Sequence, residues 1–242
     1  MYYLSLLYFI MTKLPEFTGL QPYRPIQCYR RNLPHWRQDG ATYFVTFRLS
    51  DSIPKHKIEE WQIQRNNWYV RHGLTHDLTT AEWATIYKEI PLKERGDFES
   101  WTAQQRMVEL DLCHGSCLLN KPETTQSVQK SLQFFDGERY RCGDFAIMPN
   151  HIHWIVMPLP GHQLEQIMQD IKSFTGHQIN KLHNRRGKVW QQESYDRLIR
   201  NSKELYRTRR YIYKNPPKAG LSSDNRTWQC KWLDSVYTIK FD

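Results

Sequence analysis

The sequence predicts an α+β sandwich built around an antiparallel sheet. Three observations predict it: apolar runs of strand length, amphipathic helical stretches between them, and a Pro149-Asn150 turn that joins two neighbouring strand-like runs. Strands that are joined by a tight turn pair in antiparallel fashion. The hairpin around this turn therefore sets the orientation of the predicted sheet.

The first half of the chain opens with few regular signals and then becomes helical. Residues 15–40 are rich in Pro and Arg and predict an extended basic arm. Residues 42–49 alternate and are β-branched or aromatic, which predicts a strand. Mostly helical patterns follow, clearest over residues 57–71, with a short helix over residues 80–87. A helical insertion over about residues 52–118 is therefore expected.

The second half carries stronger periodic signals. Residues 124–135 predict a helix and residues 140–148 a strand that leads into the turn. A second strand follows the turn, and residues 164–182 then form a long helix with an apolar stripe. A last helix is expected from its cap at Asn201 to Pro216, because proline is disfavoured inside a helix.

Two histidines stand two residues apart in the strand that follows the turn. Successive side chains of a strand alternate faces, so His151 and His153 point one way while Ile152 and Trp154 point the other. Both imidazoles could then bind one metal ion. A pair of hydrogen-bonded core histidines would produce the same pattern, so the motif alone leaves both interpretations open.

The last helix carries a tyrosine and an asparagine four residues apart. Tyr211 and Asn215 share a helix face, and Arg207 lies one turn earlier on the same stripe. A nucleophile, a ligand and a cation would then line up, although Tyr211 could equally belong to an ordinary amphipathic face. Tyr213 is turned away from Asn215.

Together, these motifs resemble the REP-associated tyrosine transposases, an IS200-like branch of the single-tyrosine, His-hydrophobe-His superfamily. The chain shows the Pro-x-His-hydrophobe-His strand, a Trp-Gln block, an Ile-Arg pair and a Tyr-Ile-x-x-Asn-Pro element in the family's order. The matching residues are Pro149, His151, Ile152, His153, Trp190, Gln191, Ile199, Arg200, Tyr211, Ile212, Asn215 and Pro216. Gly40 and the strand after it also resemble the opening of the family.

The resemblance implies a ferredoxin-like, RNA-recognition-motif-like arrangement of the sheet and a catalytic role for Tyr211. The nucleophile would attack a phosphodiester of single-stranded DNA and become joined to the 5′ phosphate. A free tyrosine has a pKa of about 10 and is a weak nucleophile at neutral pH without a cation. His151, His153 and Asn215 would supply that cation by binding Mg²⁺ or Mn²⁺. The expected substrate is a strand with a REP-like hairpin. Tyr195 is expected to have a structural role or to contact this DNA.

Composition agrees with a nucleic-acid partner. The 34 Lys and Arg residues exceed the 25 Asp and Glu residues, which gives a formal net charge of +9. Such a balance favours polyanions through phosphate contacts. Candidate phosphate contacts, each of which could also be an ordinary surface charge, are Arg30, Arg31, Arg139, Arg197, Arg200, Arg207 and Lys218.

The expected organisation is an N-terminal extension (1–24), of which the first residues could precede the true start, a catalytic domain (25–222) and a C-terminal tail (223–242). Five cysteines without disulfide-like spacing indicate a reducing compartment. For a DNA-processing protein we expect a cytoplasmic, nucleoid-associated location. Zinc binding at Cys113, His114 and Cys117 is not expected. The apolar start is too short to span a membrane, and no phosphate loop indicates a nucleotide cofactor.

Two other functions stay open at this point. A domesticated protein could keep the fold and bind DNA or RNA without catalysis. An unrelated metal hydrolase could use the two histidines, but it would need a carboxylate ligand that neither motif contains. The sequence allows either a monomer or a homodimer.

Overall fold

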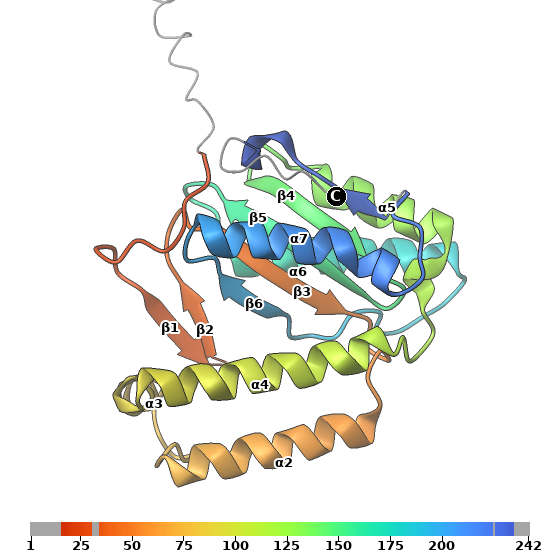
Figure 1. Cartoon of the computed structure of the whole chain (residues 1–242). Coiled ribbons are helices and arrows are strands. Elements are labelled where there is room, and N and C mark those ends of the chain that lie inside the picture. Colours follow the sequence, from red (N-terminus) through yellow and green to blue (C-terminus); the bar gives the residue numbers. More distant parts are fainter. Residues whose placement is uncertain (1–15, 31–33, 225, 235–242) are drawn as a thin grey trace, which may run out of the picture.

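The fold is described from a computed structural model, which covers residues 16–30, 34–224 and 226–234. Its centre is a five-stranded antiparallel sheet in the order β6-β3-β5-β4-β7 (Figure 1). The strands are β3 (Tyr43–Arg48), β4 (Tyr140–Ile147), β5 (His151–Pro158), β6 (Tyr195–Leu198) and β7 (Thr227–Trp228). The predicted α+β class is confirmed.

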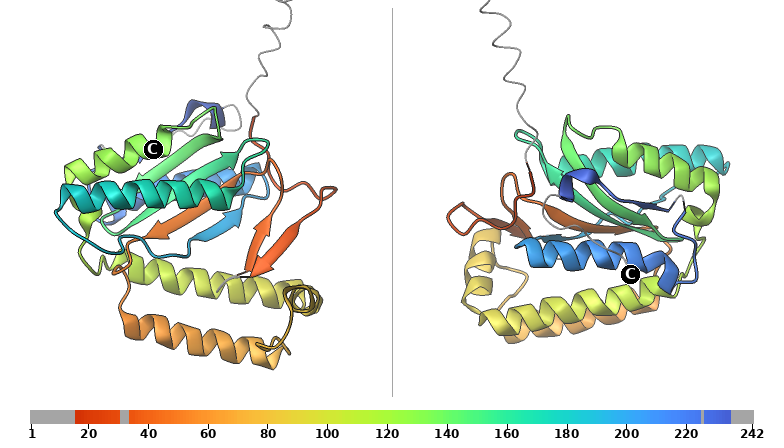
Figure 2. Two further views of the ribbon diagram at one scale, coloured as in Figure 1. Left: turned by 180° about the vertical axis from the view of Figure 1, so that it is seen from behind. Right: turned by 45° about the horizontal axis from the view of Figure 1, so that its top comes forward.

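The sheet has the ferredoxin-like connectivity that the family resemblance implies. In chain order the elements run β3, α5 (Pro122–Gln133), β4, β5, α6 (Leu164–Leu182) and β6, so four strands and two helices form a βαββαβ unit. Helices α5 and α6 cover one face of the sheet, and α7 (Ser202–Lys218) crosses the other (Figures 1 and 2). The sheet is thus enclosed between two helical layers.

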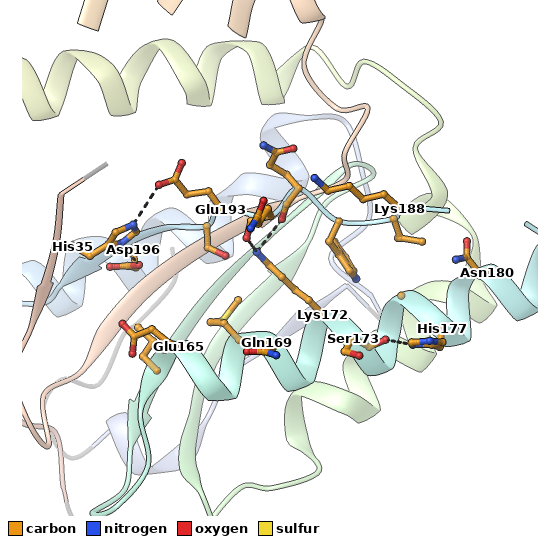
Figure 3. A pocket seen from close by; sticks show the side chains of 18 of the residues that line it. His35, Glu165, Gln169, Lys172, Ser173, His177, Asn180, Lys188, Glu193 and Asp196 are labelled. Carbon is orange, nitrogen blue, oxygen red and sulfur yellow. Dashed lines mark hydrogen bonds and ion pairs between the residues drawn. The ribbon is translucent and has the colours of Figure 1, made fainter. Parts of the chain in front are cut away.

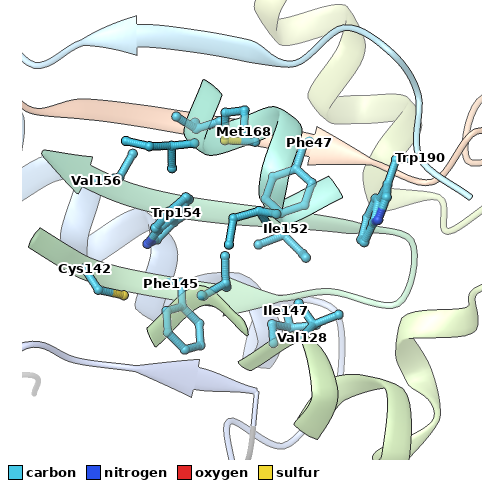
Figure 4. Packing of buried hydrophobic residues seen from close by; sticks show 14 of the residues in the cluster. Phe47, Val128, Cys142, Phe145, Ile147, Ile152, Trp154, Val156, Met168 and Trp190 are labelled. Carbon is cyan, nitrogen blue, oxygen red and sulfur yellow. The ribbon is translucent and has the colours of Figure 1, made fainter. Parts of the chain in front are cut away.

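The main core lies between the sheet and the α5/α6 layer (Figure 4). The odd-numbered residues of β3 and the even-numbered residues of β5 point into it, as strand alternation requires. Ile152, Trp154 and Val156 are fully buried there. The neighbours of these residues in the sequence must therefore face α7, and this places both histidines under that helix.

The predicted helical insertion is confirmed and consists of three helices. They are α2 (Lys55–Arg71), α3 (Thr80–Glu89) and α4 (Leu92–Asp111), which lie beside the β6/β3 edge of the sheet (Figure 1). An aromatic-rich cluster that includes Tyr69, Trp83, Tyr87 and Phe98 holds them together. Thr79 and Glu82 form a capping box at the start of α3. The insertion thus has a small core of its own.

The predicted extended arm is wrong for residues 27–30 and 34–37. They form an antiparallel pair of strands, β1 (Gln27–Arg30) and β2 (Pro34–Arg37) (Figure 1). Arg37 donates to Asp196 Oδ1 at 2.6 Å, and His35 Nδ1 lies 2.8 Å from Asp196 Oδ2. Arg37, one of the cations of the predicted arm, therefore forms an ion pair with Asp196 of β6. The first fifteen residues of the predicted extension lie outside the described part of the chain.

Helix α7 begins where the sequence predicts and ends later. The Asn201 side chain accepts a hydrogen bond from the Glu204 backbone at 3.0 Å, which caps the start. The helix does not stop at Pro216 but continues through Pro217 to Lys218. Pro216 and Pro217 have no backbone N–H to donate, and the Ala219 N–H resumes the pattern by donating to the Asn215 carbonyl at 3.2 Å.

A buried ion pair fixes α7 to the sheet. Arg209 Nε donates to Asp144 Oδ2 at 2.7 Å, and both side chains are 2% exposed. Asp144 follows Gly143 at an irregularity in the pairing of β4 with β5. Further along the chain, β7 pairs with β4, and Cys230 and Leu233 are buried beneath α7.

In the described residues, no helix combines the length and apolarity that crossing a membrane would require.

Candidate active site

The two histidines of β5 lie side by side beneath α7. His151 and His153 are fully buried on this face, and their Nε2 atoms are 3.0 Å apart. In the sheet register, His151 is opposite Arg48 of β3 and His153 is opposite Thr46. The predicted common orientation of the two rings is therefore found in the fold.

Polar neighbours hold the outer nitrogen of each ring. Asn150 donates through Nδ2 to the His114 carbonyl, so its Oδ1, 2.7 Å from His151 Nδ1, faces that ring as an acceptor. His151 then carries its proton on Nδ1 and has a lone pair on Nε2. The Thr46 hydroxyl lies 2.8 Å from His153 Nδ1. When this hydroxyl accepts a hydrogen bond, His153 also directs a lone pair from Nε2 into the site.

Tyr211 of α7 reaches the same point. Its hydroxyl lies 3.2 Å from His153 Nε2, and its ring packs edge-on against His153 and Phe44. The hydroxyl also lies 3.5 Å from Met107 Sδ of α4, so the insertion contributes to the site. Burial raises the pKa of Tyr211, the charge of Asp111 adds to the rise, and the nearby Asn215 side chain opposes it.

The remaining predicted residues of α7 divide into two groups. Asn215 is buried and close enough to Tyr211 to act on the pKa of the phenol, so the structure brings these two residues together. Arg207 is exposed on the surface of the helix. Tyr195 lies on β6 under the guanidinium of Arg106, and its partner in the β3–β6 register is Thr46.

The residues present fit a divalent cation. Burial lowers the pKa of His151 to about 3 and that of His153 well below its usual value, so both rings are neutral and have lone pairs to share. Two ligands at right angles, each about 2.1 Å from an ion, are about 3.0 Å apart. The two Nε2 atoms have this separation. Within the described residues, no group of three His, Cys, Asp or Glu side chains gathers, so Asn215 would be the third protein ligand.

The candidate phosphate contacts are scattered over the surface. Arg139 pairs with Asp170 at 3.0 Å, Arg197 with Glu204 at 3.1 Å, and Lys218 with Asp111 at 3.1 Å. Arg200 is exposed. Arg31 and the side chain of Arg30 lie outside the described part of the chain. Three of the predicted cations thus already have a carboxylate partner.

A hollow lies on the side of the sheet opposite to the histidine pair. It measures about 610 Å³ and lies between α6 and residues 187–196 (Figure 3). Lys172 crosses it and donates to the Gln191 carbonyl at 3.0 Å, and His35, Glu193 and Asp196 lie at one end. None of the histidines of β5, Tyr211 or Asn215 lines this hollow. It is therefore separate from the candidate active site.

Comparison with known proteins agrees with the geometry. Residues 119–215 match the family described as "Transposase IS200 like". The predicted resemblance to the IS200-like transposases is confirmed. The IS200-like segment contains both histidines, Tyr211 and Asn215.

Among solved structures, the chain is similar to one described as a REP-associated tyrosine transposase bound to a REP hairpin. The two chains are 13% identical, the similarity covers 82% of each, and the TM-score is 0.42. No curated protein matches the chain.

Sequence reasoning missed several residues of the site. Thr46 holds His153, Met107 covers the Tyr211 hydroxyl, and Phe44 stacks on His153 with ring centroids 5.6 Å apart. Alternation along β3 could have placed Phe44 and Thr46 on one face. No local signal could have identified Met107, because it lies 104 residues from Tyr211.

Proposed function

We propose that this protein is a metal-dependent single-strand DNA transposase that cleaves and rejoins DNA through Tyr211. The observation that carries the proposal is the position of the Tyr211 hydroxyl, 3.2 Å from Nε2 of His153 and beside the paired nitrogen of His151. Tyr211 and the two histidines meet at one point although they come from different elements. A structural tyrosine would need one hydrogen-bond partner for its hydroxyl, but not a pair of neutral imidazoles.

The reaction follows from the residues that meet. The Tyr211 oxygen attacks the phosphorus of a phosphodiester, and the bond between phosphorus and the 3′ oxygen breaks. The tyrosine hydroxyl loses one proton, and the 3′ oxygen that leaves gains one and becomes a hydroxyl. The 5′ phosphate is then esterified to Tyr211. Because the ester bond is conserved, a 3′ hydroxyl can later attack it and rejoin strands without ATP.

The surroundings of Tyr211 explain why a cation is needed. Burial raises the pKa of the phenol, so the side chain by itself is a poor nucleophile at neutral pH. Manganese or magnesium held by His151, His153 and Asn215 would supply positive charge for the developing phenolate and for the phosphate. Neutral histidines are suited to this role because they need no deprotonation.

The proposed substrate is single-stranded DNA that carries a REP-like hairpin. The sequence resemblance implies this class, and the excess of basic residues favours a polyanionic partner. One protomer contains His151, His153, Tyr211 and Asn215 at a single site, so a monomer suffices for the chemistry. A second protomer need not contribute the nucleophilic tyrosine.

The test is a search for a covalent protein–DNA adduct. The protein is incubated with labelled single strands from the flanks of its own gene, with and without Mn²⁺, and analysed under denaturing conditions. We expect a manganese-dependent adduct that Tyr211→Phe abolishes and Tyr213→Phe retains. Retained binding without any adduct would instead indicate a non-catalytic DNA-binding protein. Strand cleavage without an adduct would indicate a hydrolase.

A further inference from the structure

A small hollow next to the histidine pair is lined by three arginines. It measures about 80 Å³ and lies between β3 and β6 of the sheet and helices α2 and α4 of the insertion. Arg48 comes from β3, Arg65 from α2 and Arg106 from α4. We call this hollow the arginine pocket. It is assembled from parts of the chain that are far apart in the sequence.

The arginine pocket adjoins the candidate active site through the sheet. Thr46 lines the pocket, and its hydroxyl bonds His153 at 2.8 Å. Arg48 is directly opposite His151 in the β3–β5 register, so both side chains leave the same face of the sheet. On the insertion, Met107 contacts the Tyr211 hydroxyl while its neighbour Arg106 lines the pocket. A strand that reaches Tyr211 therefore passes beside the pocket.

The positive charge of the arginine pocket is compensated only in part, by the charge of Glu193 on Arg48 and Arg106 and that of Asp51 on Arg48. Within the described part of the chain, none of the three guanidinium groups has a carboxylate at ion-pair distance. Arg48 is 8% exposed, and its hydrogen bonds go to the neutral Leu49 carbonyl and Ser52 hydroxyl. Glu193 also lines the pocket, but its carboxylate contacts His35 at 3.4 Å.

Such burial of cations has an electrostatic cost. Desolvation lowers the pKa of Arg48 to about 10, and the charge of Arg106 adds to this fall, whereas the charges of Asp51 and Glu193 oppose it. The group stays charged at neutral pH. Isolated buried charges are destabilising unless a counter-charge binds them. The arrangement is therefore best satisfied by an anion from outside the chain.

The size of the pocket restricts that anion. A volume of about 80 Å³ holds two or three water molecules. It is too small for a nucleoside. Guanidinium groups bind phosphate oxygens in pairs, which suits a tetrahedral dianion or a phosphodiester. We propose that the arginine pocket binds one backbone phosphate of the DNA strand that Tyr211 cleaves. This inference rests on the proposed function, because it takes the strand to be the substrate.

The salt dependence of DNA binding tests the arginine pocket. Binding of a labelled oligothymidylate is measured at several salt concentrations for the full chain and for the Arg65→Gln/Arg106→Gln double variant. Loss of one phosphate contact on a single strand lowers the slope of log K against log salt by about 0.7. We expect this decrease for the double variant, and we expect Arg65→Lys/Arg106→Lys to retain most of the slope.

Arg71→Gln is the matched control because Arg71 is exposed at the end of the same helix as Arg65, outside the pocket. We expect its slope to equal that of the unmutated chain. An equal decrease in this control, or an unchanged slope in a double variant with an unchanged circular dichroism spectrum, would overturn the proposal. Arg48→Gln is left out because its burial makes loss of folding a second explanation.

The adduct assay separates this inference from the proposed function. A lower slope in the double variant together with no adduct in the unmutated protein would support the pocket and refute the tyrosine chemistry. An adduct in the unmutated protein together with an unchanged slope in the double variant would support the chemistry and refute the pocket. Each proposal thus has its own readout.

Discussion

The hydroxyl of Tyr211 lies 3.2 Å from Nε2 of His153, although 58 residues separate the two in the sequence. Helix α7 crosses the sheet above β5, and the buried Arg209–Asp144 pair fixes it there. The insertion closes the same site from the side, because Met107 of α4 contacts the hydroxyl. The candidate active site is thus shared by the sheet, α7 and the inserted helices.

Removal of the Thr46 hydroxyl should weaken metal binding. This hydroxyl lies 2.8 Å from His153 Nδ1 and can hold the ring in the tautomer that directs a lone pair into the site. We expect Thr46→Val to lower the affinity for Mn²⁺ by about 10- to 100-fold. Calorimetric titration with MnCl₂ measures the effect. Thr46→Ser keeps the hydroxyl and should bind as the unmutated protein does; equal affinities for the valine and serine variants would contradict the assignment.

The buried ion pair under α7 should be important for stability. Arg209 and Asp144 are each 2% exposed, so removing one partner leaves a buried charge without its counter-charge. We expect Asp144→Ala to lower the free energy of unfolding by about 3–5 kcal/mol in urea denaturation. Lys57→Ala breaks the exposed Lys57–Glu60 pair and should cost less than about 1 kcal/mol. A similar loss in both variants would show that burial of the pair has no special effect.

His35 should make stability depend on pH. Burial lowers its pKa, but hydrogen bonds to Asp196 and Glu193 outweigh burial and raise the pKa from 6.5 to about 8. A group whose pKa is higher in the folded state stabilises below pH 6.5 and loses that contribution as pH rises through about 8. The difference corresponds to about 2 kcal/mol. Urea denaturation at pH 6 and pH 9 should show this loss, and His35→Gln should remove it; an equal loss in the variant would assign it to other groups.

Two glycines should respond in opposite directions to an added methyl group. A Cβ at Gly143 would lie 2.6 Å from the Ile155 carbonyl oxygen, whereas a Cβ at Gly96 of α4 would meet no atom within 4 Å. We expect Gly143→Ala to destabilise by about 1–3 kcal/mol or more, because the neighbouring strand must move. Gly96→Ala should stabilise by up to about 1 kcal/mol through helix propensity. Thermal denaturation of both variants measures the difference, and destabilisation of both would exclude this steric explanation.

Much of the candidate site is determined by the sequence itself. Alternation in β5 places His151 and His153 on one face, and the four-residue spacing in α7 places Tyr211 and Asn215 together. Strong periodicity also identifies β3, β4, α6 and the start of α7. These features depend on neighbours within one element, so local patterns are sufficient to reveal them.

Only the tertiary structure decided which elements meet. The four-residue β6 and the two-residue β7 are too short for a periodic signal, and α7 continues past Pro216 because the Ala219 N–H restores the helical hydrogen bonding. Thr46, Met107 and the arginine pocket reach the site through contacts between distant segments. The sequence contains no local trace of such contacts, because they arise from how the sheet, α7 and the insertion pack against one another.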